Sequence, residues 1–153
     1  MRPRVSSGSP VLASMSSLSL SQKHEAPSVL ARTMHPALLV GFGGALGSIA
    51  RWGVAEAMPA SSDTTVPWAT IAVNLLGAFL LGAVMASSLQ TDTVLFIGTG
   101  LLGGFTTMSA FGLETVRLLQ ADSTTAAAIY VALNLLAPIT AWLGWHLSEA
   151  LLA

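Results

Sequence analysis

Four long uncharged segments follow one another along the chain, and charged residues mark the limits of each. The limiting pairs are Arg32 and Arg51, Asp63 and Asp92, Asp92 and Glu114, and Asp122 and Glu149. About 20 apolar residues in a helix are enough to cross the hydrocarbon core of a bilayer. The pattern therefore predicts an all-α protein with four transmembrane helices. We expect them at residues 36–58, 66–89, 93–119 and 123–149.

Residues 1–33 have a different composition from the rest of the chain. Serine is dense from Ser6 to Ser28, and prolines interrupt this part without a long apolar run. This composition is typical of a disordered tail, so we expect residues 34–153 to form the folded domain. Met34 stands immediately before the first apolar segment. Translation that starts at Met34 is therefore a second hypothesis, in which the tail is absent.

The composition indicates a multi-pass protein of the cell membrane. Hydrophobic residues make up 53% of the chain and charged residues only 8%, against about 25% charged residues in soluble domains. The net charge of -1 provides no basic surface, so nucleic acid is not an expected partner. The chain has no cysteine, which excludes disulfides and thiolate metal sites.

The basic residues do not define one orientation in the membrane. A chain with four spans has both termini on the same side of the membrane. That side is basic if the tail is present, and it has no Lys or Arg if translation starts at Met34. The relevant residues are Arg2, Arg4, Lys23 and Arg32 on that side, and Arg51 and Arg117 on the other. Because the positive-inside bias changes sign with the start site, we expect insertion in both orientations. Two oppositely oriented copies would form an antiparallel, dual-topology dimer.

The third segment contains a stretch with poor helix propensity, from Gly103 to Glu114. It begins with two adjacent glycines, and two threonines and a serine follow that can bond the nearby backbone. Backbone groups freed at membrane depth need protein or a polar cavity to satisfy them. We therefore predict a broken third helix built around an ion. The carbonyls that end its first half suit a hard cation such as Na+, and the N–H groups that begin its second half suit an anion.

Two asparagines lie within predicted spans. Asn74 either makes an interhelical hydrogen bond or lines a pore and donates to an anion. Asn134 has the same two interpretations, and it shares a helix face with Tyr130 four residues earlier. That face forms either a structural contact or a polar track.

Four further side chains are candidates for a role in ion binding. Phe111 has a ring whose positive edge suits an anion, although simple packing also explains Phe111 and Met108. Arg51 is either an interfacial anchor or a vestibule charge that attracts anions. Glu114 is either an interfacial carboxylate or the partner of an arginine, Arg51 or Arg117. No set of residues typical of catalysis occurs at membrane depth, so we do not expect an enzyme.

Three sequence motifs resemble those of the Fluc (CrcB) fluoride-channel family, and the resemblance covers nearly all of residues 36–150. The first has paired glycines, a third glycine and an arginine. The second has the order Val-Asn-x-x-Gly-x-Phe, and the third contains Gly-Gly-x-Thr-Thr. These motifs occupy Gly43–Arg51, Val73–Phe79 and Gly103–Phe111.

The resemblance implies a passive, fluoride-specific channel that exports cytoplasmic fluoride and reduces its toxicity. It also implies a dual-topology dimer with two antiparallel pores and a structural Na+ at its centre. The Na+ ligands would be the backbone carbonyls of Gly103 and Thr106. The pore residues would be Asn74, Met108, Ser109, Phe111, Tyr130 and Asn134. The backbone near Ser109 would be a further donor to fluoride.

Several positions depart from the family pattern. Met108 stands where a phenylalanine is expected, Ala110 replaces a threonine or serine, and Asn134 stands where serine is more usual. Pro138 replaces a small residue and is expected to kink the fourth helix. These departures favour, as an alternative, one subunit of a heterodimer that is non-conducting alone or supplies half of each pore.

A small multidrug/proton antiporter is the other alternative. It would need a carboxylate deep within a helix. Glu56, Glu114 and Glu149 all lie near the ends of the predicted spans, which argues against an antiporter.

Overall fold

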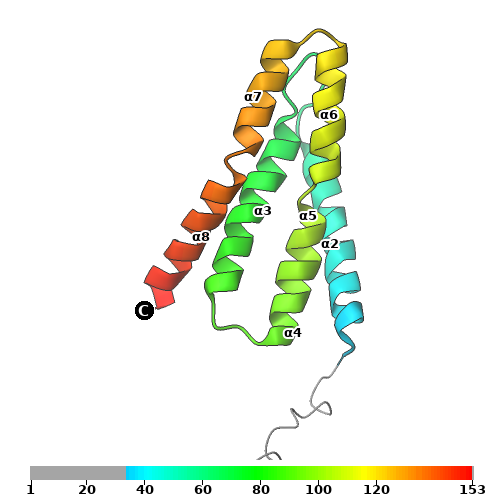
Figure 1. Cartoon of the computed structure of the whole chain (residues 1–153). Helices are drawn as coiled ribbons and strands as arrows, with labels where there is room; N and C mark the ends of the chain where they lie inside the picture. Colours follow the sequence, from blue (N-terminus) through cyan, green and yellow to red (C-terminus); the bar gives the residue numbers. More distant parts are fainter. Residues whose placement is uncertain (1–33, 153) are drawn as a thin grey trace, which may run out of the picture. The chain divides into compact units, whose positions relative to one another are not determined.

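The computed structural model describes residues 34–152, so the predicted tail of residues 1–33 lies outside the described residues. The first two spans are single helices, α2 (Pro36–Ala57) and α3 (Trp68–Ala86). The third consists of α4 (Thr91–Val94), the π-helix η2 (Leu95–Leu102), α5 (Gly103–Phe105) and α6 (Met108–Gln120). The fourth consists of α7 (Thr124–Asn134) and α8 (Ala137–Leu152) (Figure 1).

Four helical spans are long and apolar enough to cross a membrane. They are Pro36–Ala57, Trp68–Ala86, Thr91–Gln120 and Thr124–Leu152, each within a few residues of the range expected from the charges. Within residues 34–152 the regular structure is entirely helical. The prediction of an all-α protein with four spans is therefore confirmed, whereas the dual-topology dimer stays a prediction.

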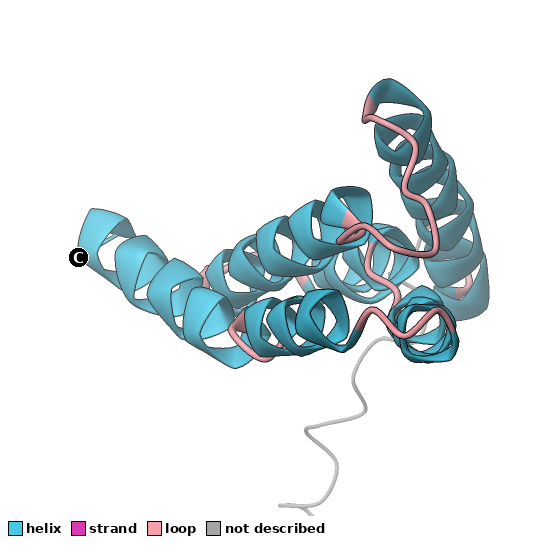
Figure 2. Ribbon diagram, turned by 90° about the horizontal axis from the view of Figure 1, so that it is seen from above, coloured by secondary structure: helices cyan, strands magenta, loops and turns pink. Residues whose placement is uncertain are grey.

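The spans run alternately in opposite directions, so both ends of the described region lie at the same end of the bundle (Figure 1). Seen from above, α7 and α8 follow one another across a short loop (Figure 2). α8 packs closely along α3, because Gly82 of α3 lies against the backbone of Ala141 and Gly144 of α8 lies against that of Phe79. The short helices of the third span continue one another between α2 and α3 (Figure 1).

Glycines allow α2 to lie directly against the backbone of the third span. A Cβ atom at Gly43 would overlap the carbonyl oxygen of Phe96, and a Cβ at Gly47 would overlap that of Leu101. Small residues four positions apart on one helix face allow two helix backbones to approach this closely. The fold therefore depends on backbone-to-backbone packing along α2.

The π-helix η2 was not predicted from the sequence. Its residues are as apolar as those of an α-helical span, and hydrophobicity at membrane depth does not distinguish the two helix types. The wider turns include Gly98 and Gly100 and lie against α2 at its glycines. Because π-helical turns are rare and concentrate near functional sites, the segment that follows η2 is a candidate functional site.

One apolar core lies where α3, α6 and α7 meet. Its buried members are Ile71, Leu118, Ala127 and Tyr130, and Phe111 packs against them. Many large apolar side chains elsewhere remain exposed, among them Ile49 of α2 and Leu135 in the fourth span. Such an outer surface is suited to contact with lipid or with another membrane-spanning chain.

Candidate functional site

The third span is broken at Thr106 and Thr107. Both residues have extended backbones, with φ/ψ values of -77°/156° at Thr106 and -149°/113° at Thr107. α5 therefore ends at Phe105 and α6 begins at Met108. The expected break is present, and it lies at the threonines rather than at the glycines. Gly104 remains helical and packs against the backbone of Gly44 in α2.

Asn74 of α3 binds the broken segment through both ends of its amide. Its Oδ1 accepts from the backbone N–H of Thr107 at 2.7 Å, and its Nδ2 donates to the carbonyl of Thr107 at 3.1 Å. The same Nδ2 also donates to Oδ1 of Asn134 in α7 at 2.8 Å. We call these bonds among Asn74, Thr107 and Asn134 the Asn74 network. It joins three spans at the break.

The backbone carbonyls predicted to bind Na+ have lost their helical donors at the break. In a continuous α-helix, the N–H of Thr107 would donate to Gly103 and the N–H of Ala110 to Thr106. Here Thr107 N–H donates to Asn74, and Ala110 N–H donates to the Thr107 hydroxyl at 3.2 Å. Side-chain acceptors thus take both donors, and the carbonyls of Gly103 and Thr106 suit a hard cation that prefers oxygen ligands.

Arg51 of α2 binds the neighbouring carbonyl. Its Nε donates to the carbonyl of Gly104 at 3.3 Å. That carbonyl would accept from the N–H of Met108 if the helix continued. Arg51 is therefore more than an interfacial anchor, because its guanidinium lies against the negative end of the first half-helix.

A cavity of about 250 Å³ lies beside the break. We call it the Asn74 cavity. Its lining residues are Asn74, Ala78, Leu81, Thr106, Thr107, Met108, Phe111, Asn134 and Ala137. Four of the six predicted pore residues are therefore brought together, and they come from three different spans.

The other two predicted pore residues lie outside the lining of this cavity. Ser109 is exposed, and its hydroxyl is 3.2 Å from that of Thr107. Tyr130 is fully buried, and its ring centroid lies 5.3 Å from that of Phe111. Met108 lines the cavity, and 77% of its surface is exposed. The cavity wall that Met108 forms is therefore open to a neighbouring molecule.

Glu114 contacts a tyrosine rather than an arginine. The hydroxyl of Tyr130 donates to its Oε2 at 2.5 Å. Between Pro36 and Leu152, the ion pair found joins His146 to Glu149, and Glu114 does not pair with Arg51 or Arg117. Glu114 also lines a small polar cavity of about 50 Å³, together with Arg117 and the loop residues Ser61, Ser62 and Asp63.

The fourth span is also interrupted, as Pro138 had suggested. Proline has no N–H, so the carbonyl of Asn134 loses its helical donor. α7 ends at Asn134, the N–H of Leu136 donates to Leu133, and α8 begins at Ala137. Asn134 and Ala137, the residues on either side of this interruption, both line the Asn74 cavity.

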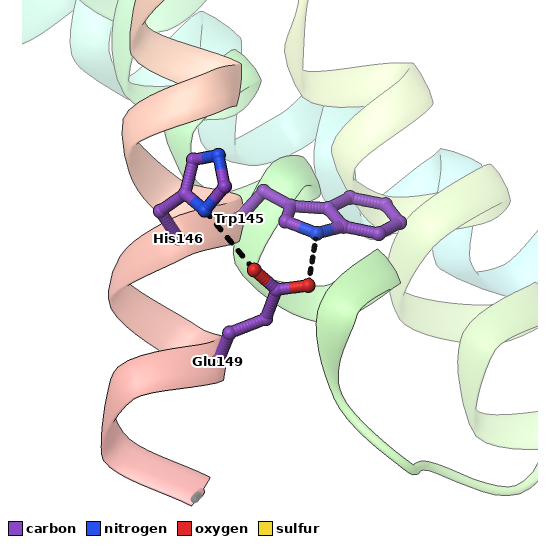
Figure 3. A network of polar contacts seen from close by, with 3 residues as sticks. All are labelled: Trp145, His146 and Glu149. Atoms are coloured by element: carbon purple, nitrogen blue, oxygen red, sulfur yellow. Dashed lines mark hydrogen bonds and ion pairs between the residues drawn. The ribbon is translucent and has the colours of Figure 1, made fainter.

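A second group of polar contacts lies far along α8 and belongs to one helix. Glu149 accepts from Trp145 Nε1 at 2.7 Å, and its other oxygen is 3.0 Å from His146 Nδ1 (Figure 3). Both side chains of the ion pair are 51% exposed. His146 thus lies near the end of the last span, as expected of an interfacial residue, and outside the lining of the Asn74 cavity.

Sequence reasoning did not include Thr107 among the site residues. Its backbone binds Asn74 twice, and its hydroxyl caps the first turn of α6. The available signal was its position before Met108, because threonine is a favoured residue immediately before a helix. A capping threonine in the middle of a membrane span marks a helix that restarts there.

Comparison with known proteins gives a consistent result. Residues 38–145 match the family described as CrcB-like protein, Camphor Resistance (CrcB). The chain is 42% identical to "Fluoride-specific ion channel FluC 1" of Halobacterium salinarum, over 73% of this chain and 92% of that protein. It is 41% identical to "Fluoride-specific ion channel FluC" of Thermus thermophilus, over 74% of this chain and 95% of that protein.

A relative named FluC 2 is matched over a similar share of its length. The chain is 38% identical to "Fluoride-specific ion channel FluC 2" of Bacillus cereus, over 74% of this chain and 98% of that protein. The region that matches the family, residues 38–145, begins in the first span, ends in the fourth and contains both interruptions. On the evidence of its sequence motifs, its four spans and these relatives, the chain belongs to the CrcB-like family.

Proposed function

We propose that this protein is a passive, fluoride-specific ion channel that exports cytoplasmic fluoride and so reduces its toxicity. The observation that carries the proposal is the Asn74 cavity, where amide, hydroxyl and aromatic groups meet at a helix break at membrane depth. The names of the relatives support fluoride as the ion. No enzymatic step is part of the proposal.

Fluoride is small and strongly hydrated, so a selective pore must replace its water with closely placed donors. The Asn74 amide, the hydroxyl and backbone N–H at Ser109, and the positive edge of the Phe111 ring are the candidate donors. Tyr130 and Asn134 continue the polar groups along α7. Arg51 and Glu114 are proposed as charged residues at the approach to this path. A larger anion such as chloride would be coordinated less closely by the same groups.

A dimer and a structural Na+ are part of the same proposal. The carbonyls of Gly103 and Thr106 would hold Na+ together with the same groups of a second, antiparallel chain. Support comes from the loss of their helical donors and from the exposure of Gly103. The ion would neutralise the negative end of the half-helix and connect the two subunits. The exposed Met108 would contact the partner chain at the pore.

A heterodimer is the second candidate for the assembly. Met108 favours it, because a thioether stands where the family pattern has an aromatic ring. Relatives named FluC 1 and FluC 2 are consistent with two-chain systems. In that case, this chain would supply half of each pore or no conducting pore by itself.

The test is fluoride efflux from liposomes that hold only this chain, with a potassium ionophore present to balance charge. We expect rapid fluoride efflux, negligible chloride efflux and no requirement for a proton gradient. Efflux that appears only with a homologous chain would identify the heterodimer. Efflux that requires a proton gradient would favour the antiporter. No fluoride efflux under any of these conditions would contradict the proposal.

A further inference from the structure

The amide of Asn74 has no N–H group free in this structure. Its two hydrogens point to the Thr107 carbonyl at 3.1 Å and to Asn134 Oδ1 at 2.8 Å. An asparagine amide has two hydrogens to donate. An anion in the Asn74 cavity can therefore bind this amide only if one of the two protein oxygens gives way.

The orientation of both amides is fixed by their partners. Turning Asn134 over would place its nitrogen against the nitrogen of Asn74 and its oxygen against the carbonyl oxygen of Tyr130, to which its Nδ2 now donates at 3.0 Å. Turning Asn74 over would place its nitrogen against the N–H of Thr107. Each alternative sets like groups against each other, so the hydrogen-bond pattern has one consistent solution.

The two oxygens that hold Asn74 differ in their freedom to move. The Thr107 carbonyl belongs to the backbone of the break, and Thr107 is bound to Asn74 a second time through its N–H. The oxygen of Asn134 belongs to a side chain, which can turn about its own single bonds once the bond from its Nδ2 to the Tyr130 carbonyl also yields. The bond to Asn134 is therefore the one that an incoming anion can replace.

We propose that Asn134 is a specificity-determining residue, whose side-chain oxygen occupies the anion's place on Asn74 until fluoride displaces it. The proposal rests on the fluoride-channel function proposed above. A neutral amide oxygen is a weaker acceptor than a small anion, since hydrogen bonds to charged groups are about twice as strong as neutral ones. Fluoride displaces Asn134, whereas water and large halides compete with it poorly. The contact thus closes the cavity to other solutes.

The test compares efflux through variants of Asn134 in liposomes. Asn134→Ala and Asn134→Ser remove the competing amide oxygen, and fluoride efflux should rise by between about twofold and tenfold, the range that corresponds to one ordinary hydrogen bond. Chloride efflux, negligible in the natural chain, should become measurable in Asn134→Ala. The nearly isosteric Asn134→Asp retains a stronger acceptor and adds a negative charge, so fluoride efflux should fall.

Thr140→Ala is the matched control, because it removes a polar group at the contact between α8 and α3. The Thr140 hydroxyl lies 3.1 Å from the Leu75 carbonyl of α3 and 2.9 Å from the Ala137 carbonyl of its own helix. Thr140 does not line the Asn74 cavity, so fluoride efflux through the Thr140→Ala variant should equal that of the natural chain. If the natural chain conducts only together with a partner chain, every variant is assayed with that same partner.

The outcomes separate this inference from the proposed function. If the natural chain conducts fluoride but neither Asn134→Ala nor Asn134→Ser conducts it faster, the inference is contradicted and the proposed function is not. If neither of these folds, an Asn134→Asp variant that conducts as fast as the natural chain contradicts it instead. A natural chain that conducts no fluoride, with or without a partner, contradicts the proposed function and the inference together.

Discussion

The third and fourth spans are both interrupted, but the two interruptions are held in different ways. At the third, side chains from α2 and α3 bind the freed backbone: Arg51 donates to Gly104, and Asn74 binds Thr107 twice. At the fourth, the backbone bonds around the interruption are made within the span itself. The N–H of Leu136 donates to Leu133 at 3.1 Å, and the N–H groups of Ile139 and Thr140 donate back to Leu136.

The difference shows which interruption depends on the rest of the fold. The break at Thr106 and Thr107 is supported by residues distant in sequence, so a change in another helix can disturb it. The interruption near Pro138 results from one residue that lacks an N–H. The two meet at the bond between Asn74 and Asn134. The account therefore predicts that changes to the residues holding the third-span break affect function most.

The largest expected effect comes from Asn74→Asp. A carboxylate still accepts from Thr107 N–H but turns an oxygen toward the oxygens of Thr107 and Asn134, and it adds a negative charge to the cavity. We expect fluoride efflux from liposomes to fall by more than about tenfold, since breaking a buried polar pair and adding an unpaired charge costs several kcal/mol. Unchanged efflux would remove Asn74 from the mechanism.

The next effect comes from Gly47→Val, which tests the support that α2 gives to the third span. A side chain here would overlap the carbonyl of Leu101, so α2 and the third span must separate. Overpacking of this kind costs about 1–3 kcal/mol, which should lower the melting temperature in detergent by several degrees. Gly53→Val is the matched control, because nothing lies within 4 Å of a Cβ at Gly53. Equal melting temperatures for the two variants would show that the close packing of α2 is not needed.

A smaller effect is expected for Arg51→Gln. This change removes the positive charge beside the Gly104 carbonyl while a shorter donor remains available. Since Arg51 is half-buried, we expect a loss of about 1 kcal/mol in stability and efflux reduced a few-fold, more at low ionic strength than at high. Arg51→Lys keeps the charge and should recover most of the activity. If Gln and Lys behave alike, charge at this position is irrelevant to the break.

The smallest effect is expected for Glu149→Gln, which lies away from both interruptions. It removes an exposed ion pair with His146 within one helix, and such pairs contribute about 0–1 kcal/mol. Efflux should match that of the natural chain within measurement error. A large loss would mean that the end of α8 takes part in conduction.

Much of the architecture could be predicted because membrane spans are defined by simple physical limits. Charged residues cannot lie cheaply in hydrocarbon, so their positions set the four spans. The Gly-Gly-x-Thr-Thr sequence indicated a break, because each of these residues weakens a helix or competes for its bonds. Pro138 indicated the second interruption for the same kind of local reason.

What the sequence did not indicate depends on contacts between distant residues. The pairing of Asn74 with Asn134, 60 residues apart, follows from how three spans pack and leaves no local pattern. The same is true of Arg51 on the Gly104 carbonyl and of the contact between Glu114 and Tyr130. The π-helix was missed because its composition is that of any apolar span. The dimer and its Na+ remain predictions, since they depend on a second chain.

The most direct test of whether fluoride passes through the Asn74 cavity uses a single cysteine. The natural chain contains none, so Ala137→Cys places one reactive thiol in the cavity wall. Labelling it with a bulky thiol reagent should stop fluoride efflux from liposomes, while the same reagent should leave the natural chain unaffected. Efflux that continues at full rate through a chain shown by mass spectrometry to be completely labelled would contradict the account.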